Sequence, residues 1–397
     1  MTDFYAAAQR LDHVNFSPVR KVLERANQLA DEGMSILHLE MGEPDFDTPK
    51  AIVDATADAL CVQKRTHYAP NRGVLKLREN ISRMLKEQYH ADYDGASEIL
   101  LTCGAAESIF DVIMGIVNPK DEIIIMTPAY MNYENCINMA GAKCVKVELE
   151  ESDGYQVNRD VLESAITAQT RMIVVTNPNN PTGTVLSKDS LNEIASIAKK
   201  YDLIVMADEI YAALTYGVEF TSFASLEGMR DRTIIVSGFS KCFAMTGWRV
   251  GYIAADARFI PSILKVHQYT TTCIPTFIQD GLADGMFADK TNEAVHAMVS
   301  TFDERRRLVT NVLDQIPEIS YGKADGAFYV FANVGATGLD GTTFATRLLE
   351  EKGVAIVPGA AFGENCTDCV RISYSAASEI LKESLQRIKD FVEGLRK

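Results

Sequence analysis

The chain has 397 residues, of which 47% are hydrophobic and 23% are charged, a composition typical of a globular protein. This length exceeds what one hydrophobic core usually organises, so we expect two domains. A formal net charge of -15 argues against a nucleic-acid-binding surface, because phosphate binding requires a basic face.

We predict the cellular compartment from the absence of a signal-peptide pattern and of a membrane-spanning run in the sequence. Its first ten residues do not show a basic region followed by an apolar one, and no later run approaches about 18 uncharged apolar residues. We therefore expect no membrane segment and a cytoplasmic location. The eight cysteines are scattered, and we do not expect a disulfide framework in so large a chain.

One cysteine pair, Cys366 and Cys369, has the spacing of half a zinc site. A structural zinc site of this type needs a second ligand pair, and none stands nearby in the sequence. We interpret the pair as a loop before a strand and predict no bound metal.

The first segment with a clear periodicity is helical. Apolar residues recur from Val19 to Leu29 and predict a helix that ends near Gly33, followed by a short strand over Ile36–Leu39. Residues 42–46 are typical of a turn. The polar, turn-rich residues 67–73 predict a loop with one buried tyrosine, Tyr68.

A strand predicted over Ile99–Thr102 leads into three small residues, Gly104, Ala105 and Ala106, and then into a helical pattern that reaches Ile116. A strand, a small-residue turn and a helix start together can form a phosphate cradle, because unpaired N–H groups and the helix dipole both point at the anion. The alternative interpretation is close packing at a helix start.

From here short β-rich runs alternate with helical stretches. One such helix, over residues 191–198, follows an expected capping box from Ser190 to Glu193. The alternation predicts a mostly parallel sheet with helices on both faces, whose strand ends gather the motifs in one crevice. The runs are Ile123–Met126, Cys144–Val147, Met172–Val175, Leu203–Ala207, Thr233–Val236 and Val250–Ala254.

Lys241 follows the run that ends at Val236, so we expect it just past the carboxyl end of a strand, where open α/β sheets bind ligands. Small and hydroxyl neighbours such as Gly238 and Ser240 permit close approach of a ligand and supply donors beside the amine. Taken alone, the segment is more typical of a surface turn with a solvated lysine.

After about residue 285 the regular alternation of strands and helices ends. A long polar helix carries Arg305, residues 326–331 are typical of a strand, and a further helix ends at Gly353. These elements predict a smaller α+β domain.

Three stretches identify a family resemblance: Asn177–Gly183, Asp208–Tyr211 and Ser237–Gly251. In this order they resemble the class I and II aminotransferases of the aspartate aminotransferase type, which bind pyridoxal 5'-phosphate (PLP) on a lysine. With the motifs at Gly42 and Arg371, the resemblance covers nearly the whole chain. It implies PLP fold type I, an α/β fold with a mostly parallel seven-stranded sheet in a large domain.

The resemblance also implies domain boundaries. Residues 46–285 would form the large PLP-binding domain, and residues 286–397 the small C-terminal domain. Residues 1–45 would form an N-terminal arm and part of the small domain, which is then discontinuous.

The resemblance assigns the cofactor's chemistry to a few residues. Lys241 would bind PLP covalently and move protons, which requires a lowered amine pKa. Asp208 would hold the pyridine nitrogen protonated. Asn180 and Tyr211 would bind the ring hydroxyl, and Tyr130 would stack on the ring, although alone it is equally typical of a core aromatic.

Further residues would hold the phosphate and the substrate. Arg249, Ser240 and the turn Gly104–Ala106 would bind the phosphate, while Arg371 would bind the substrate α-carboxylate as a bidentate fork beside Gly42. For either arginine the alternative is a surface ion pair. Tyr68 would reach the phosphate of a neighbouring subunit, which implies a homodimer with shared active sites.

Two departures from the family pattern limit which residue roles and which substrate specificity can be transferred to this chain. Gly238 replaces a serine that many relatives use toward the phosphate. Ala106 stands where bacterial aspartate enzymes of this subgroup can place a lysine for the distal carboxylate. Specificity for dicarboxylates is therefore open.

Three functions compete. The first is transfer of an amino group from an L-amino acid to a 2-oxo acid. The second is another PLP reaction on this scaffold, carbon–sulfur β-elimination, because the fold does not choose the reaction. The third is a PLP-binding module of a regulator, which the absence of a basic helix-turn-helix segment argues against.

Overall fold

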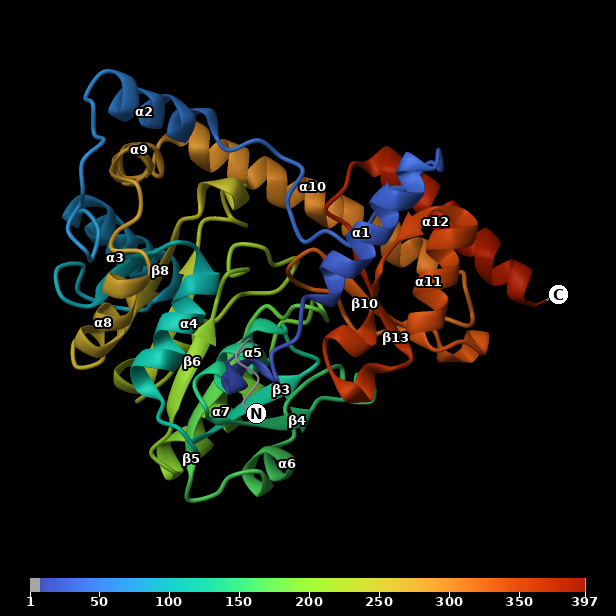
Figure 1. Ribbon diagram of the computed structural model, residues 1–397, viewed down its shortest axis with the longest axis horizontal. Helices are drawn as coiled ribbons and strands as arrows, with labels where there is room; N and C mark the ends of the chain where they lie inside the picture. The colour runs from blue at the N-terminus through green and yellow to red at the C-terminus, as the bar shows by residue number, and fades with distance from the viewer. Residues whose placement is uncertain (1–7, 397) are drawn as a thin grey trace, which may run out of the picture.

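A seven-stranded sheet forms the centre of the computed structural model, which describes residues 8–396 (Figure 1). Its strands are β2 (Ile99–Thr102), β3 (Glu122–Thr127), β4 (Lys143–Glu148), β5 (Thr170–Thr176), β6 (Ile204–Asp208), β7 (Thr233–Gly238) and β8 (Gly251–Ala254). Each lies within two residues of its predicted bounds.

The strands pair in the order β2-β8-β7-β6-β5-β3-β4. All neighbouring pairs from β7 to β4 are parallel, whereas β8 runs antiparallel to both β2 and β7. One reversed strand in seven confirms the prediction of a mostly parallel sheet. The carboxyl ends of the parallel strands consequently meet at one edge.

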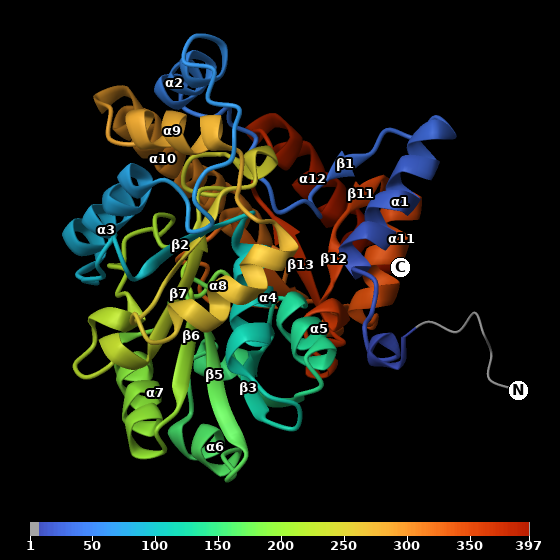
Figure 2. The ribbon, with the colours of Figure 1, turned by 60° about the vertical axis from the view of Figure 1, so that its left-hand side comes forward.

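Helices surround this sheet and continue into the carboxyl-terminal part (Figure 2). They are α1 (Pro18–Asp31), α2 (Lys50–Cys61), α3 (Leu75–Tyr89), α4 (Ala105–Ile116), α5 (Asn132–Met139), α6 (Arg159–Ser164), α7 (Lys188–Lys200), α8 (Ile260–Thr270), α9 (Thr276–Gly285), α10 (Asp289–Leu313), α11 (Gly341–Lys352) and α12 (Ser378–Leu395).

Alternation along the strands places buried side chains on both sheet faces. In β3, Ile123 and Ile125 join a core cluster with residues of α4, α5 and α8. Ile124 and Met126 join a second cluster with residues of α7 on the opposite face. Because successive strand residues point to opposite faces, an unbroken apolar run indicates a sheet covered on both sides.

A second, four-stranded sheet lies in the carboxyl-terminal part, in the order β12-β13-β10-β9. Its strands are β9 (Ser320–Tyr321), β10 (Tyr329–Asn333), β12 (Val357–Pro358) and β13 (Cys369–Ser373). The short strand β1 (Leu37–His38) pairs in parallel with β11 (Val354–Ala355), so the early segment joins the late one. The domain boundaries at residues 45 and 285 stay a prediction.

Helix α10, orange in Figure 1, runs from the side of α2 to the side of α12 and so connects the two parts of the molecule. Within residues 8–396 no helix combines the length and the apolar character needed to cross a membrane.

Two local predictions were wrong. The N-cap of α7 is Ser187, whose hydroxyl accepts from the Ser190 amide, whereas Ser190 lies inside the helix and binds Gln156 instead. The strand expected from residue 326 begins only at Tyr329, because Ala327 has φ +56° and interrupts the extended backbone.

The packing of α2 on α9 gives a test of the fold. A Cβ at Gly281 would lie 2.4 Å from Thr56 Cα and 2.6 Å from its backbone nitrogen, so Gly281→Ala forces the helices apart. Overpacking of this kind destabilises by about 1–3 kcal/mol, and we expect a Tm several degrees lower in thermal unfolding. The matched control is Gly394→Ala in α12, where a Cβ meets nothing within 4 Å. We expect it to keep or raise the Tm, and an equal decrease in both variants would contradict this packing.

Candidate active site

A cavity of about 690 Å³ opens where strands of the large sheet end. Tyr130 comes three residues after β3, Asn180 four after β5, Asp208 ends β6, and Lys241 comes three after β7. The cavity wall contains eleven of the predicted site residues: Gly42, Ala105, Ala106, Tyr130, Asn180, Asp208, Tyr211, Ser240, Lys241, Arg249 and Arg371.

Two predicted residues lie elsewhere. Gly104 stands behind the wall, where a Cβ would meet Arg249 Nη2 at 2.5 Å. Tyr68 does not line the cavity of its own chain, and its side chain is 89% exposed. The prediction of a buried tyrosine in this loop is therefore wrong for the single chain, because the loop turns its aromatic ring outward.

The amine of Lys241 donates to the backbone oxygen of Gly42 at 2.5 Å. Burial lowers the pKa of this amine to about 8, Glu43 opposes the decrease, and the guanidinium groups of Arg371 and Arg249 add to it. Most of the amine is therefore still protonated at pH 7, but a minor fraction is neutral and grows as the pH approaches 8, and a neutral amine is both a nucleophile and a base.

The carboxylate of Asp208 is buried and faces the same cavity. Its Oδ2 accepts from the Tyr133 hydroxyl at 2.6 Å, and its Oδ1 accepts from the Ile210 amide at 3.2 Å. Burial raises its pKa to about 6, and these two hydrogen bonds oppose the rise. Within residues 8–396 no cation pairs with it, so it offers a negative charge to a cationic ligand.

Arg371, in β13, is buried beside the cavity. It donates to Asn180 Oδ1 at 3.0 Å and to the backbone oxygen of Glu40 at 2.7 Å, and its guanidinium lies 4.4 Å from the centre of the Tyr329 ring. Its Nε has no partner among the described residues. A guanidinium held by neutral acceptors retains its charge for an anion such as a carboxylate.

The amino terminus of α4 faces the cavity with Ala105 and Ala106, its first two residues, whose N–H groups have no acceptor within the helix. Gly104, the N-cap, has φ +81°, which favours glycine. Arg249 donates to the oxygens of Thr246 and Cys103, so its guanidinium lies next to this turn. Free amides, a helix dipole and a guanidinium together suit a phosphate group.

Sequence reasoning missed two tyrosines that shape the cavity. Tyr133 lies in the first turn of α5, three residues after Tyr130, and the two rings meet edge to face with centroids 5.9 Å apart. Tyr329 lies in β10, and its hydroxyl is 2.8 Å from that of Tyr211. A Cβ at Gly42 would meet the Tyr329 hydroxyl at 2.3 Å, so this position requires glycine.

The sequence around this site matches one protein family over most of its length. Residues 35–388 match the family described as aminotransferase class I and II. The chain belongs to the class I and II aminotransferases.

Similar proteins support the same family. An aspartate aminotransferase of Pyrococcus abyssi is 40% identical over 97% of each chain, and an aromatic-amino-acid aminotransferase of Thermococcus litoralis is 38% identical over 97% of each. The crystal structure of an aromatic aminotransferase of Pyrococcus horikoshii superimposes with a TM-score of 0.88 at 38% identity, covering 95% of this chain and 99% of that one. The protein is thus a transaminase with the fold type predicted.

The hydrogen bond from Tyr133 tests how this aminotransferase keeps Asp208 ionised. Tyr133→Phe removes a donor to a charged group, worth about 1.5–3 kcal/mol, so we expect kcat/KM to fall by about 10- to 100-fold. Losing a bond that lowers the pKa also raises the Asp208 pKa. Activity that needs the carboxylate is then lost at a higher pH as the solution is acidified, which a pH profile of kcat/KM measures.

The control is Tyr216→Phe, which removes another buried hydroxyl, hydrogen-bonded to the Ala327 oxygen outside the cavity wall. It should leave the pH profile unchanged. A rate loss in Tyr133→Phe without a shift of the acidic limb would show that Tyr133 does not act through the carboxylate.

Proposed function

We propose that this aminotransferase uses PLP to move the amino group of an L-amino acid to a 2-oxo acid. The observation that carries the proposal is one cavity in which the amine of Lys241, the carboxylate of Asp208 and the guanidinium of Arg371 converge. These three groups supply a nucleophilic base, a charge for a cationic ring and a binding group for a carboxylate.

Three features of the cavity fit PLP. The amides of Ala105 and Ala106 with Arg249 suit its phosphate, and the close approach of Arg249 to Gly104 leaves no space for a larger side chain there. The buried carboxylate of Asp208 lacks a cation, which a protonated pyridine nitrogen would supply. The Lys241 amine suits covalent attachment of an aldehyde. When bound, PLP supplies an electrophilic carbonyl and a ring that withdraws electrons.

The residues around the cavity then have separate roles in substrate binding, proton transfer and charge stabilisation. Arg371, held by Asn180 and Glu40, binds the substrate α-carboxylate and fixes the α-carbon beside Lys241. The neutral amine of Lys241 takes the α-proton and later returns a proton, so one group acts as base and acid. Asp208 would hold the ring nitrogen of the cofactor protonated, and the Tyr133 hydroxyl fixes the orientation of its carboxylate.

The substrate side chain is not selected by the cavity's charge alone. Arg20 and Glu43 both line the wall, so it presents one cation and one anion in addition to the groups assigned above. Ala106 offers no charge to a distal carboxylate. We propose an L-amino acid donor of either kind, acidic or aromatic, as the names of the relatives suggest, and a cytoplasmic location in line with the sequence prediction.

A half-reaction screen tests the function. The PLP form is mixed with single amino acids, and we expect the true donor to convert it to the pyridoxamine form without any 2-oxo acid present. Lys241→Ala should lose this conversion by at least about a thousandfold, because it lacks both the attachment point and the base. Circular dichroism checks that the variant is folded.

Release of pyruvate and ammonia from cystathionine without a 2-oxo acid, in the absence of a half-reaction, would contradict the proposed transfer and favour the β-lyase. Wild-type conversion rates in Lys241→Ala would refute its assigned role.

We propose further that two chains share their active sites. Tyr68 does not line the cavity of its own chain and is 89% exposed, and its loop is held against α9 by the Thr276 hydroxyl, which donates to the His67 oxygen. The family resemblance implies that a second copy covers this ring and receives its hydroxyl at the phosphate-binding end of the cavity. The active site would then be complete only in a homodimer.

Hybrid dimers test this assembly. Tyr68→Ala and Lys241→Ala, each nearly inactive alone, are unfolded, mixed equally and refolded together. Random pairing makes half of the dimers mixed, and each mixed dimer has one intact site, so up to about a quarter of the wild-type activity should return.

The control pairs Arg371→Ala with Lys241→Ala, whose residues line the cavity of the same chain. This pair should return no activity, because every site of the mixed dimer lacks one group. A fully active monomeric wild type, or mixed dimers of the first pair without activity, would contradict shared sites.

A further inference from the structure

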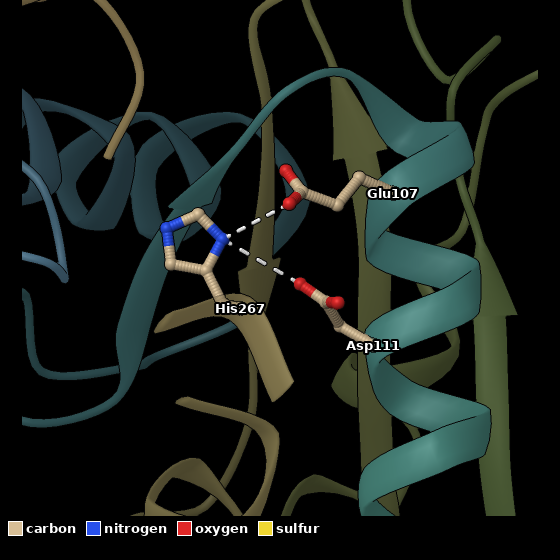
Figure 3. Close-up of side chains that lie close together, drawn as sticks. All are labelled: Glu107, Asp111 and His267. Atoms are coloured by element: carbon tan, nitrogen blue, oxygen red, sulfur yellow. Dashed lines mark ion pairs between the residues drawn. The ribbon is translucent and has the colours of Figure 1, made fainter. Parts of the chain in front are cut away.

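A second group of ionisable side chains lies outside the reaction cavity. Glu107 and Asp111 lie one turn apart on α4, and His267 lies in the last turn of α8, so that all three point toward one another (Figure 3). None of them lines the cavity that contains Lys241. The proposed transamination therefore leaves them without a role.

The group is buried and incompletely hydrogen-bonded. The side chains of Asp111 and His267 are fully buried, and that of Glu107 is 10% exposed. Neither carboxylate oxygen of Asp111 and neither ring nitrogen of His267 has a hydrogen-bond partner among the described residues. Asp111 and His267 face one another at ion-pair distance but without a hydrogen bond, and burying such groups without hydrogen bonds is costly, so their lone pairs are available to a ligand.

The distances within the group suit a small cation. His267 Nδ1 lies 3.3 Å from Glu107 Oε1 and 3.5 Å from Asp111 Oδ2, and the three donor atoms all lie within 4.8 Å of one another. Ligands at about 2.0–2.1 Å from a tetrahedral zinc ion are separated by roughly 3.3–3.4 Å. The two separations from His267 Nδ1 therefore match two edges of such a coordination sphere.

The charges of the three side chains also favour a bound cation. Two carboxylates contribute two negative charges, and an imidazolium would cancel only one of them. A divalent cation bound by two carboxylates and a neutral imidazole leaves no net charge in the buried group. The surroundings fix the Glu107 carboxylate, because its Oε1 accepts from the Thr270 hydroxyl at 3.0 Å and from the Thr271 hydroxyl, and its Oε2 accepts from the Cys103 amide.

We propose that Glu107, Asp111 and His267 form a binding site for a divalent transition-metal ion, with zinc the best fit and a water as the fourth ligand. Imidazole with carboxylates is a donor set that zinc accepts, and it disfavours magnesium and calcium, which prefer oxygen alone. The ion would join α8 to the first turns of α4, close behind the Gly104–Ala106 turn. Its role is structural, and it does not depend on the proposed reaction.

Metal titration of the holoenzyme tests the site. The protein is freed of metal with a chelator, desalted into phosphate-free buffer and titrated with Zn²⁺ by calorimetry, with elemental analysis of the product. We expect one ion per chain and a Tm several degrees higher with zinc, because a ligand that binds only the folded state stabilises it. Asp111→Asn and His267→Gln should each weaken binding at least about 100-fold.

Two controls separate this site from other metal-binding groups. Glu122→Gln removes a carboxylate elsewhere, paired with Lys143, and should leave zinc binding unchanged. The double variant Cys366→Ser with Cys369→Ser should also bind normally, and X-ray absorption of the zinc-loaded wild type should show nitrogen and oxygen ligands without sulfur.

The X-ray absorption measurement uses the wild type, so it remains decisive if a variant fails to fold. Absence of saturable zinc binding, sulfur ligands, or unchanged affinity in folded Asp111→Asn would overturn the proposal.

Discussion

The carboxylate of Asp208 lies buried at the end of β6 with two hydrogen-bond donors and no cation among the described residues. A charge in this state is stable only if its surroundings compensate it, and burial already raises its pKa to about 6. Tyr133 opposes that rise, and its hydroxyl in turn accepts from Thr176 at 2.9 Å. The cavity consequently presents a buried negative charge that a cationic ligand would compensate.

The parallel sheet explains why the complementary groups lie nearby. Strand ends that share an edge bring Tyr130, Asn180, Asp208 and Lys241 together although the sequence separates them widely. The second sheet adds Arg371 from β13, and the chain before α2 adds Gly42. The site thus needs the packing of both parts of the chain, which explains why the whole sequence, rather than one segment, carries the family's motifs.

The sequence predicted what depends on local chemistry. Apolar runs predict all seven strands of the large sheet, and the resemblance to the family assigns motif residues such as Lys241 and Asn180 to the site. The contacts themselves were not predictable from a pattern. The Tyr133 hydroxyl donates to Asp208, which lies 75 residues away in the sequence. The N-cap of α7 is Ser187 rather than the predicted Ser190, whose hydroxyl donates to Gln156 instead. Nor did any motif connect Glu107 with His267, which meet only through the packing of α4 on α8.

The protonation state of the bound cofactor tests the central claim, that the Asp208 charge is held for a cationic ring. The measurement is the ¹⁵N chemical shift of PLP labelled at the pyridine nitrogen, recorded in the wild type and in Asp208→Asn. The account predicts a protonated nitrogen in the wild type and an unprotonated one in the variant, which lacks the compensating charge. The same chemical shift in both proteins would contradict it.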